Sequence, residues 1–306
     1  MRNITLGLSG LTVPAIAVGC MRITSVEKTE AERFIKTALE LGAFFFDHAD
    51  IYGQGECEER FAEAIGMNPR VRESICLQSK CGIRSGVAFD FSKEHILAAA
   101  DGILKRLKTE YLDVLLLHRP DALMEPEEVA EAFNILHNRG KVRHFGVSNH
   151  NPYQIRLLTK YVRQPIVVNQ LQLSITNSSM ISQGLHVNMS EQDAVDRDGG
   201  VLDFCRLKDI TIQTWSPLQY GFFDGPFLGN KKFPKLNAKI DEIAAKYGVS
   251  NTTIAVAWLL RHPAQLQPVI GTWKISRFAE CVKAAEIKLS REEWYALFIA
   301  AGNTLP

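Results

Sequence analysis

The apolar residues of this chain alternate between short continuous runs and stripes at three- and four-residue spacing. Eight runs have the length and the content of Val, Ile, Leu and Phe that buried strands require. They are VPAIAV (13–18), FFFD (44–47), ICLQS (75–79), VLLL (114–117), HFGV (144–147), IVVN (166–169), TIQTW (211–215) and PVIG (268–271). Continuous rather than alternating apolar residues indicate parallel strands that are buried on both faces.

Helical stripes separate the runs, most clearly over 31–39, 96–107, 129–136, 236–247 and 254–260. A strand followed by a helix, repeated eight times, is typical of a (β/α)8 barrel. An open, doubly wound parallel sheet is the alternative, but eight units without a linker to a second domain favour closure. We therefore expect one barrel domain over residues 1–306.

Three segments lie outside this alternation. The stretch ITLGLSGLTV (4–13) predicts a hairpin with Ser9 and Gly10 at its turn, placed across the bottom of the barrel. Residues 174–200 are polar and predict a long loop after the sixth strand. From Ser290 onward, Trp294, Leu297 and Phe298 recur at helical spacing and predict an extra helix after the eighth unit.

Composition excludes several classes of protein. The chain has 46% hydrophobic and 23% charged residues, which is normal for globular domains and excludes disorder. Lys and Arg number 35 against 34 Asp and Glu, so a net charge of +1 offers no overall field for nucleic acid or an anionic membrane. No apolar run approaches the ~20 residues that span a bilayer, and the start is expected to be a poor signal peptide. We expect a cytoplasmic protein with its six cysteines reduced.

Polar or small residues stand where seven of the eight predicted strands end. In barrel enzymes the chemistry lies at the carboxyl ends of the strands, so these residues are expected to surround one cavity. In order they are Gly19, Asp47, Lys80, His118, Ser148 with Asn149, Asn169 with Gln170, Trp215 with Ser216, and Gly271 with Thr272.

Three of these side chains, together with Tyr52, suggest acid–base chemistry. Asp47 and Tyr52 share the loop DHADIYG after the second strand, close to the predicted position of Lys80. An adjacent ammonium favours phenolate, so Lys80 is expected to lower the pKa of Tyr52 from about 10. Asp47 would hold Lys80 charged, and His118 would act as a hydrogen-bond donor or proton partner across the cavity.

Seven motifs, met in order along the chain, resemble the signatures of the aldo-keto reductase family. They are DHADIYG (47–53), SKCG (79–82), VLLLHRPD (114–121), GKVRHFGVSN (140–149), NQLQLS (169–174), WSPL (215–218) and GTWKISRFAE (271–280). The resemblance implies a catalytic tetrad of Asp47, Tyr52, Lys80 and His118. Tyr52 would protonate the carbonyl oxygen of an aldehyde or ketone, and a nicotinamide cofactor would supply the hydride.

The same resemblance implies the cofactor site. Ser148, Asn149 and Gln170 match residues that hold the nicotinamide carboxamide, and Trp215 matches the aromatic side chain that stacks on the ring. The full set that we expect to bind the cofactor is Gly19, Cys20, Met21, Ser148, Asn149, Gln170, Trp215, Ser216, Pro217, Leu218, Ile270, Gly271, Thr272, Lys274, Arg277, Glu280 and Cys281.

The expected cofactor is NADPH or NADP+. No GxGxxG motif follows a strand, so a classical dinucleotide fingerprint is absent. Lys274 and Arg277 open a helix where cations and backbone amides together can bind phosphate, and the family uses this stretch for the adenosine 2′-phosphate. His48, Trp273 and Cys281 depart from common family residues, which affects the adenine side more than the chemistry.

Two alternatives stay open at this point. Some relatives of this fold act as nucleotide-binding regulatory subunits of channels, although no extended polar segment precedes the barrel here. A metal-dependent hydrolase could use Asp47, His48, Asp50 and His118, but no HxH or HExxH pair and no zinc-ligand spacing is present. We expect a small-molecule carbonyl substrate as partner, without nucleic acid, membrane, metal or obligate protein partner.

Overall fold

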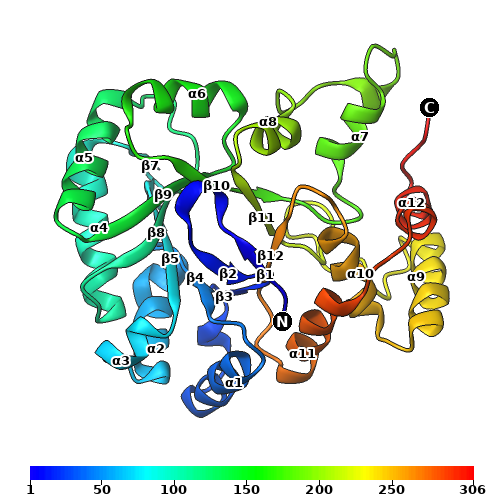
Figure 1. The fold of residues 1–306 in the computed structure, drawn as a ribbon, viewed down its shortest axis with the longest axis horizontal. Helices are drawn as coiled ribbons and strands as arrows, with labels where there is room; N and C mark the ends of the chain where they lie inside the picture. The colour runs from blue at the N-terminus through cyan, green and yellow to red at the C-terminus, as the bar shows by residue number, and fades with distance from the viewer.

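Eight parallel strands form a closed barrel in the computed structural model, which describes residues 1–306. Neighbours in the ring follow their order along the chain (Figure 1). The strands are β3 (Ala17–Gly19), β4 (Phe45–Asp47), β5 (Cys76–Cys81), β8 (Leu112–Leu117), β9 (Val142–Ser148), β10 (Ile166–Gln172), β11 (Thr211–Trp215) and β12 (Gln267–Ile270). The predicted (β/α)8 barrel is confirmed, and the open-sheet alternative is wrong.

The first predicted strand, 13–18, is two strands in the structure. Its start belongs to β2 (Thr12–Pro14), which pairs antiparallel with β1 (Asn3–Thr5), and only Ala17–Gly19 joins the barrel. Pro14 has no N–H to donate, and the amide of Ala15 bonds back to the carbonyl of Arg2. Because the residues on both sides of this break are apolar, the pattern of hydrophobic residues alone does not show where one strand ends and the next begins.

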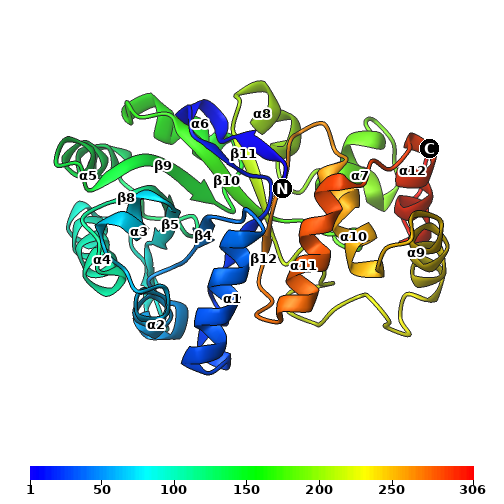
Figure 2. The same ribbon diagram turned by 60° about the horizontal axis from the view of Figure 1, so that its bottom comes forward.

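Helices surround the barrel, and most of them bury one apolar stripe, whereas α10 is buried on all sides from Thr253 to Leu260. They are α1 (Lys28–Glu40), α2 (Glu56–Ile65), α3 (Pro69–Glu73), α4 (Lys93–Leu107), α5 (Pro126–Asn138), α6 (Pro152–Tyr161), α8 (Val201–Leu207), α9 (Pro234–Tyr247), α10 (Asn251–Leu260) and α11 (Ile275–Lys283). Side-chain caps begin several of them: Ser92 accepts from the amide of His95, and Asn151 forms a capping box with Gln154. The ring of helices closes where α11 lies beside α1 (Figure 2).

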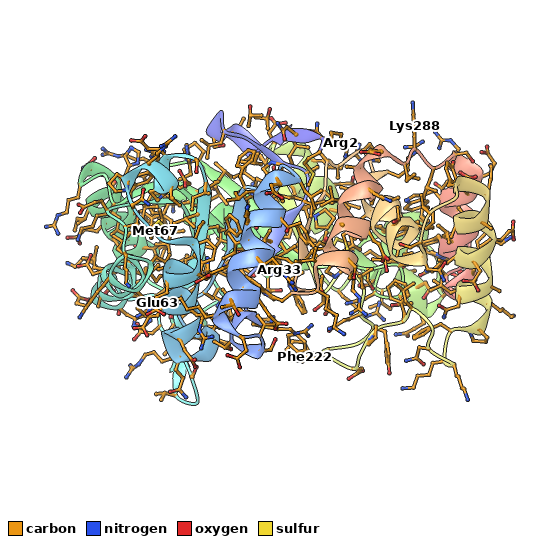
Figure 3. All side chains as sticks on the ribbon, turned by 90° about the horizontal axis from the view of Figure 1, so that it is seen from below. Arg2, Arg33, Glu63, Met67, Phe222 and Lys288 are labelled. Atoms are coloured by element: carbon orange, nitrogen blue, oxygen red, sulfur yellow. The ribbon has the colours of Figure 1, made fainter.

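The N-terminal hairpin covers one end of the barrel. A short 3-10 helix (Gly7–Ser9) connects β1 to β2, so the predicted tight turn at Ser9 and Gly10 is wrong in its geometry. Gly7 has a positive φ, and a Cβ there would collide with the carbonyl oxygen of Val167 at the start of β10. Arg2 on this hairpin and Phe222 lie at opposite ends of the molecule (Figure 3).

Residues 174–200 are more ordered than predicted. They contain α7 (Ser179–Leu185) and a 3-10 helix (Gln192–Ala194), so the expected long loop is only partly present. Short polar helices give almost no periodic signal, which explains the miss. A small hairpin of β6 (Ile83–Arg84) and β7 (Ala88–Phe89) after β5 was not predicted either.

The extra C-terminal helix is present as α12 (Arg291–Ala300). It is attached to α10 through two stacked indoles, Trp258 and Trp294, whose ring centres are 4.7 Å apart. Each indole N–H donates to the backbone carbonyl of the other tryptophan, at 3.1 and 3.0 Å. None of the helices combines the length and the apolar character needed to cross a membrane.

Candidate active site

A cavity of about 670 Å³ opens at the carboxyl ends of the barrel strands, opposite the N-terminal hairpin. Residues from seven of the eight strand ends line it, including Asp47, Tyr52, His118 and Trp215. The side chain of Lys80 is fully buried directly behind them. The prediction that the residues at the strand ends surround one cavity is therefore confirmed for seven of the eight strands.

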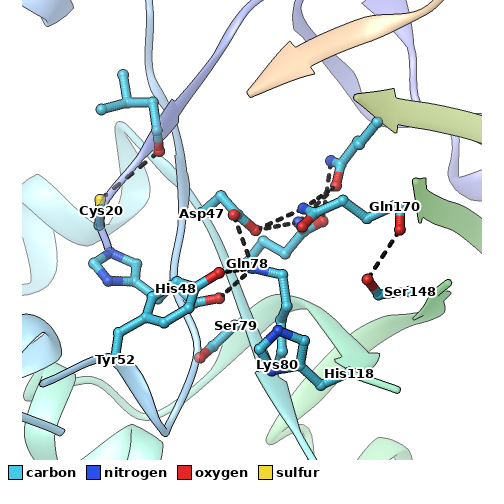
Figure 4. Close-up of polar contacts among 12 residues, drawn as sticks. Cys20, Asp47, His48, Tyr52, Gln78, Ser79, Lys80, His118, Ser148 and Gln170 are labelled. Carbon is cyan, nitrogen blue, oxygen red and sulfur yellow. Dashed lines mark hydrogen bonds and ion pairs between the residues drawn. The ribbon is translucent and has the colours of Figure 1, made fainter. Parts of the chain in front are cut away.

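A continuous chain of polar contacts joins Asp47, Lys80 and Tyr52 (Figure 4). The ammonium of Lys80 donates to Asp47 Oδ2 at 2.8 Å, to the carbonyl oxygen of His48 at 2.8 Å and to the hydroxyl oxygen of Tyr52 at 3.2 Å. These three acceptors use all three donors of the ammonium. Lys80 is therefore fixed in position and aimed at the phenol.

The structure gives the direction in which the pKa values of Lys80 and Tyr52 are shifted, and one of the two differs from the prediction made from sequence. Burial by itself lowers the pKa of Lys80, but Asp47 and Tyr52 raise it, and the resulting pKa lies above the usual value. Burial raises the pKa of Tyr52, and the lowering by Lys80 offsets this only in part, so the net shift is upward. The expected lowering of the phenol pKa is thus wrong in its net direction, because desolvation is the larger effect. Tyr52 retains its proton, and Lys80 is charged.

His118 is uncharged at neutral pH. Burial, followed by the positive charge of Lys80, lowers its pKa well below 6.5. Its Nδ1 is buried without a hydrogen-bond partner, and its ring meets that of Tyr52 edge to face at 6.0 Å between centres. A neutral imidazole beside the phenol can donate one hydrogen bond to a carbonyl oxygen bound in the cavity.

The loop that carries Tyr52 is held by a tight turn and a buried ion pair. Gly53, Gln54 and Gly55 all have positive φ, at 56°, 53° and 97°. A Cβ on Gly55 would lie 2.7 Å from the Arg106 side chain, which pairs with buried Glu58 at 2.7 Å. Glycine is required at this point because the turn approaches Arg106 so closely.

A row of buried glutamines fixes the other carboxylate oxygen of Asp47. Gln78 and Gln170 donate to Asp47 Oδ1 at 2.6 and 3.0 Å, and both also donate to Oε1 of Gln213. Gln213 in turn donates to Gln267, whose amide donates to the carbonyl oxygen of Pro14. Four amide side chains, all nearly inaccessible to solvent, thus connect Asp47 through the barrel interior to the N-terminal hairpin.

Comparison with known proteins identifies the family of this barrel. The sequence model described as "Aldo/keto reductase family" matches residues 15–298. The chain belongs to the aldo-keto reductase family. The match spans every strand of the barrel and all four residues of the expected tetrad.

Several relatives of this aldo-keto reductase are bacterial oxidoreductases. The chain is 35% identical to the uncharacterized oxidoreductase YcsN of Bacillus subtilis, over 94% of each chain. It is 33% identical to a 6-dehydroglucose reductase of Novosphingobium aromaticivorans, covering 98% of this chain and 96% of that one. The crystal structure of the thermostable aldo-keto reductase Tm1743 with the inhibitor epalrestat superposes with a TM-score of 0.79 at 27% identity, over 98% of this chain and all of the other.

Thirteen of the 17 residues expected to bind cofactor line the cavity of this aldo-keto reductase. They are Gly19, Met21, Ser148, Asn149, Gln170, Trp215, Ser216, Pro217, Leu218, Ile270, Gly271, Thr272 and Arg277. Asn149 and Ser216 have positive φ, at 61° and 51°, which turns the chain sharply after β9 and β11. Asn149 donates to the Ser148 hydroxyl at 2.7 Å and accepts from the Trp215 indole at 3.1 Å.

The remaining four residues do not line the cavity. Cys20 and Cys281 are completely buried, and the Cys20 thiol faces the carbonyl of Val18 at 3.7 Å. Both thiols are packed in the apolar core and do not face the cavity, so a cofactor contact by Cys20 or Cys281 stays a prediction. Lys274 and Glu280 lie outside the cavity, Lys274 as the exposed residue that precedes α11.

Several residues of the site were missed in the sequence. Arg119, Phe222 and Phe223 line the cavity, and Gln78 and Gln213 support Asp47 from within the barrel. The signal for the glutamines was available: Gln78 and Gln213 interrupt apolar strands that bury both faces. Phe222 and Phe223, each 6.0 Å from the Trp215 ring, lie on a glycine-flanked loop whose position the sequence does not specify.

The residues of the metal-hydrolase alternative do not form a metal site. His48 is buried with both ring nitrogens unpartnered and its ring against Phe61, and burial lowers its pKa to about 3. No group of three or more His, Cys, Asp or Glu side chains in the structure is arranged to hold a metal ion.

Asp50 gives the stability of this aldo-keto reductase an unusual pH dependence. Burial, reinforced by Glu58, raises its pKa from 3.8 to about 7, and its Oδ1 has no partner. Between about pH 4 and pH 7 the folded state therefore binds a proton that the unfolded state has already released. The free energy of unfolding consequently decreases as the pH rises through this range.

We expect the gain in the free energy of unfolding from Asp50→Asn to be about 2 kcal/mol larger at pH 8 than at pH 5, measured by urea unfolding. Equal gains at both pH values, or the same difference in the exposed control Glu32→Gln, would contradict this.

Proposed function

We propose that this aldo-keto reductase is an NADPH-dependent reductase of aldehydes or ketones, with Tyr52 as the proton donor. The observation that carries the proposal is the chain of contacts from Asp47 through Lys80 to the hydroxyl of Tyr52, which ends in the cavity beside His118. A protonated phenol and a neutral imidazole lie together there as two donors toward one carbonyl oxygen.

The residues of the cavity fit a nicotinamide cofactor. The NH2 group of Gln170 is used by Asp47 and Gln213, so its oxygen is left as an acceptor on the cavity side, next to the polar groups of Ser148 and Asn149. This pattern suits a carboxamide, and Trp215 adds an aromatic face. When bound, the nicotinamide supplies the hydride.

The chain's own residues handle the proton. The Tyr52 hydroxyl can donate to the carbonyl oxygen as negative charge develops there, while His118 orients that oxygen with a second hydrogen bond. The phenolate left on Tyr52 is stabilised by the ammonium of Lys80, 3.2 Å away. Asp47 keeps Lys80 in place, and the two glutamine amides on Asp47 keep that carboxylate in place.

The names of relatives agree with a carbonyl substrate. Proteins named 6-dehydroglucose reductase, at 33% and 30% identity, act by name on a carbonyl compound derived from a sugar. We propose the same reaction class for this chain. A cytoplasmic location and the lack of an obligate protein partner stay predictions of the sequence.

Arg277 tests the preference for NADPH. It lies on the first turns of α11 and lines the cavity beside Thr272, where it makes no ion pair within the protein. Losing a charge-assisted hydrogen bond costs about 1.5–3 kcal/mol, so Arg277→Ala is expected to weaken NADPH binding about 10- to 100-fold. NADH binding should change far less, because NADH lacks the 2′-phosphate.

Titration of intrinsic fluorescence with each cofactor measures both affinities. Arg139→Ala, which removes an exposed cation at the end of α5, serves as a charge-matched control. An unchanged ratio of NADPH to NADH affinity in Arg277→Ala would refute the assignment of the 2′-phosphate site.

A further inference from the structure

Arg119 places a positive charge beside the catalytic tetrad. It directly follows His118 after β8, is half-buried, and lines the same cavity as Tyr52. Its guanidinium carbon lies 5.7 Å from the ring centre of Trp215 and 5.9 Å from that of Phe222. The guanidinium therefore lies close to two aromatic rings that also line the cavity.

No acidic residue compensates this charge. Arg119 makes no ion pair and no hydrogen bond through its guanidinium, whereas the buried guanidinium of Arg72 pairs with Asp113 at 2.7 Å. Burial lowers the pKa of Arg119, and the only opposing influence comes from the phenol of Tyr52. The one carboxylate that lines the cavity, Asp47, already binds Lys80. Since a partly desolvated cation without a partner is unfavourable, a bound anion would relieve that cost.

This charge lies on the opposite side of the cavity from the expected cofactor phosphate. Arg119 follows β8 and Arg277 follows β12, and these strands are four positions apart in a ring of eight. The two arginines therefore face different groups. Arg119 is next to the residues that handle the carbonyl, and Arg277 is at the start of α11.

We propose that Arg119 binds an anionic group of the substrate, so that the preferred substrates are aldehydes or ketones that also carry a carboxylate or a similar anion. The planar guanidinium can form two parallel hydrogen bonds with a carboxylate. The aromatic rings of Trp215 and Phe222 lie beside the guanidinium and would limit the access of water to that contact on one side. This inference rests on the proposed carbonyl reductase activity and specifies its substrate class.

Three isomers of carboxybenzaldehyde and their methyl esters test the proposal. Each pair differs only in the charge, and the isomers vary the spacing between carbonyl and carboxylate. Wild-type protein should prefer at least one acid over its ester. In Arg119→Gln the acid-to-ester ratio of kcat/KM should fall about 10- to 100-fold, the loss expected for a charge-assisted hydrogen bond. Arg119→Lys keeps the charge but cannot form the two parallel hydrogen bonds, so its acid-to-ester ratio should lie between those of the wild type and Arg119→Gln.

A binding measurement separates this proposal from the reductase activity itself. Calorimetric titration with benzoate, which has no carbonyl to reduce, should show binding to wild-type protein that is lost in Arg119→Gln and retained in Arg139→Gln. If no aldehyde is reduced but benzoate binding depends on Arg119, the proposed activity is wrong and the anion site stands. If acid and ester respond equally to Arg119→Gln and benzoate binding does not change, the anion site is refuted.

Discussion

Tyr52→Phe is expected to lower kcat for carbonyl reduction by about 10²- to 10⁴-fold, the contribution that a positioned general acid makes. The ring of phenylalanine can occupy the same place against His118, at 6.0 Å, so the cavity keeps its shape. The substitution removes only the hydroxyl, which accepts from Lys80 at 3.2 Å and which we propose as the proton donor to substrate. The rate of NADPH oxidation in the presence of an aldehyde measures the effect.

Cofactor affinity provides the control for this variant. Fluorescence titration with NADPH should give nearly the wild-type affinity, because Tyr52 is not one of the residues expected to hold the nicotinamide carboxamide. A Tyr52→Phe protein that retains near-normal turnover would show that the proton comes from another group.

Lys80→Met is expected to lower the free energy of unfolding by about 3–5 kcal/mol, the cost of removing one partner of a buried ion pair. Lys80 is fully buried, and its loss leaves the carboxylate of Asp47, 2% exposed, with amide donors alone. The backbone carbonyl of His48 also loses its donor. Urea denaturation at neutral pH measures the change, and activity should be lost with it.

A double variant shows whether the unpaired charge causes the loss. Lys80→Met with Asp47→Asn removes both charges, and it should recover a large part of the stability but none of the activity. No recovery would mean that packing around Lys80, rather than the ion pair, supplies the stability. The exposed pair of Lys239 and Glu242 offers a contrast, since Lys239→Met should change stability by less than about 1 kcal/mol.

The barrel and most of its site could be predicted from sequence, because both depend on order along the chain. Continuous apolar runs located all eight barrel strands, and in a closed parallel barrel the ends of those strands must meet. The proximity of Asp47, Lys80 and His118 could therefore be predicted without any measured distance. Local chemistry at each strand end was enough to define the cavity.

Features that depend on packing could not be predicted in this way. The pKa of Tyr52 depends on a balance between burial and the nearby ammonium, and burial is visible only in three dimensions. Cys20 follows β3 directly, but the orientation of its backbone turns the thiol into the core. The division of 13–18 into two strands required the pairing partner of Thr12–Pro14, which is a tertiary contact.

In the row of buried glutamines, each side-chain amide fixes the orientation of the next. The carbonyl of Pro14 orients the NH2 group of Gln267, which turns the oxygen of Gln267 toward Gln213. The oxygen of Gln213 must then face the NH2 groups of Gln78 and Gln170. Turning any one amide over would place like atoms against each other at each of its contacts in the row. The orientation of the Gln170 amide, which places its oxygen on the cavity side, thus depends on the carbonyl of Pro14 in the N-terminal hairpin. The hairpin at the far end of the barrel therefore helps to set the hydrogen-bonding pattern of the active site.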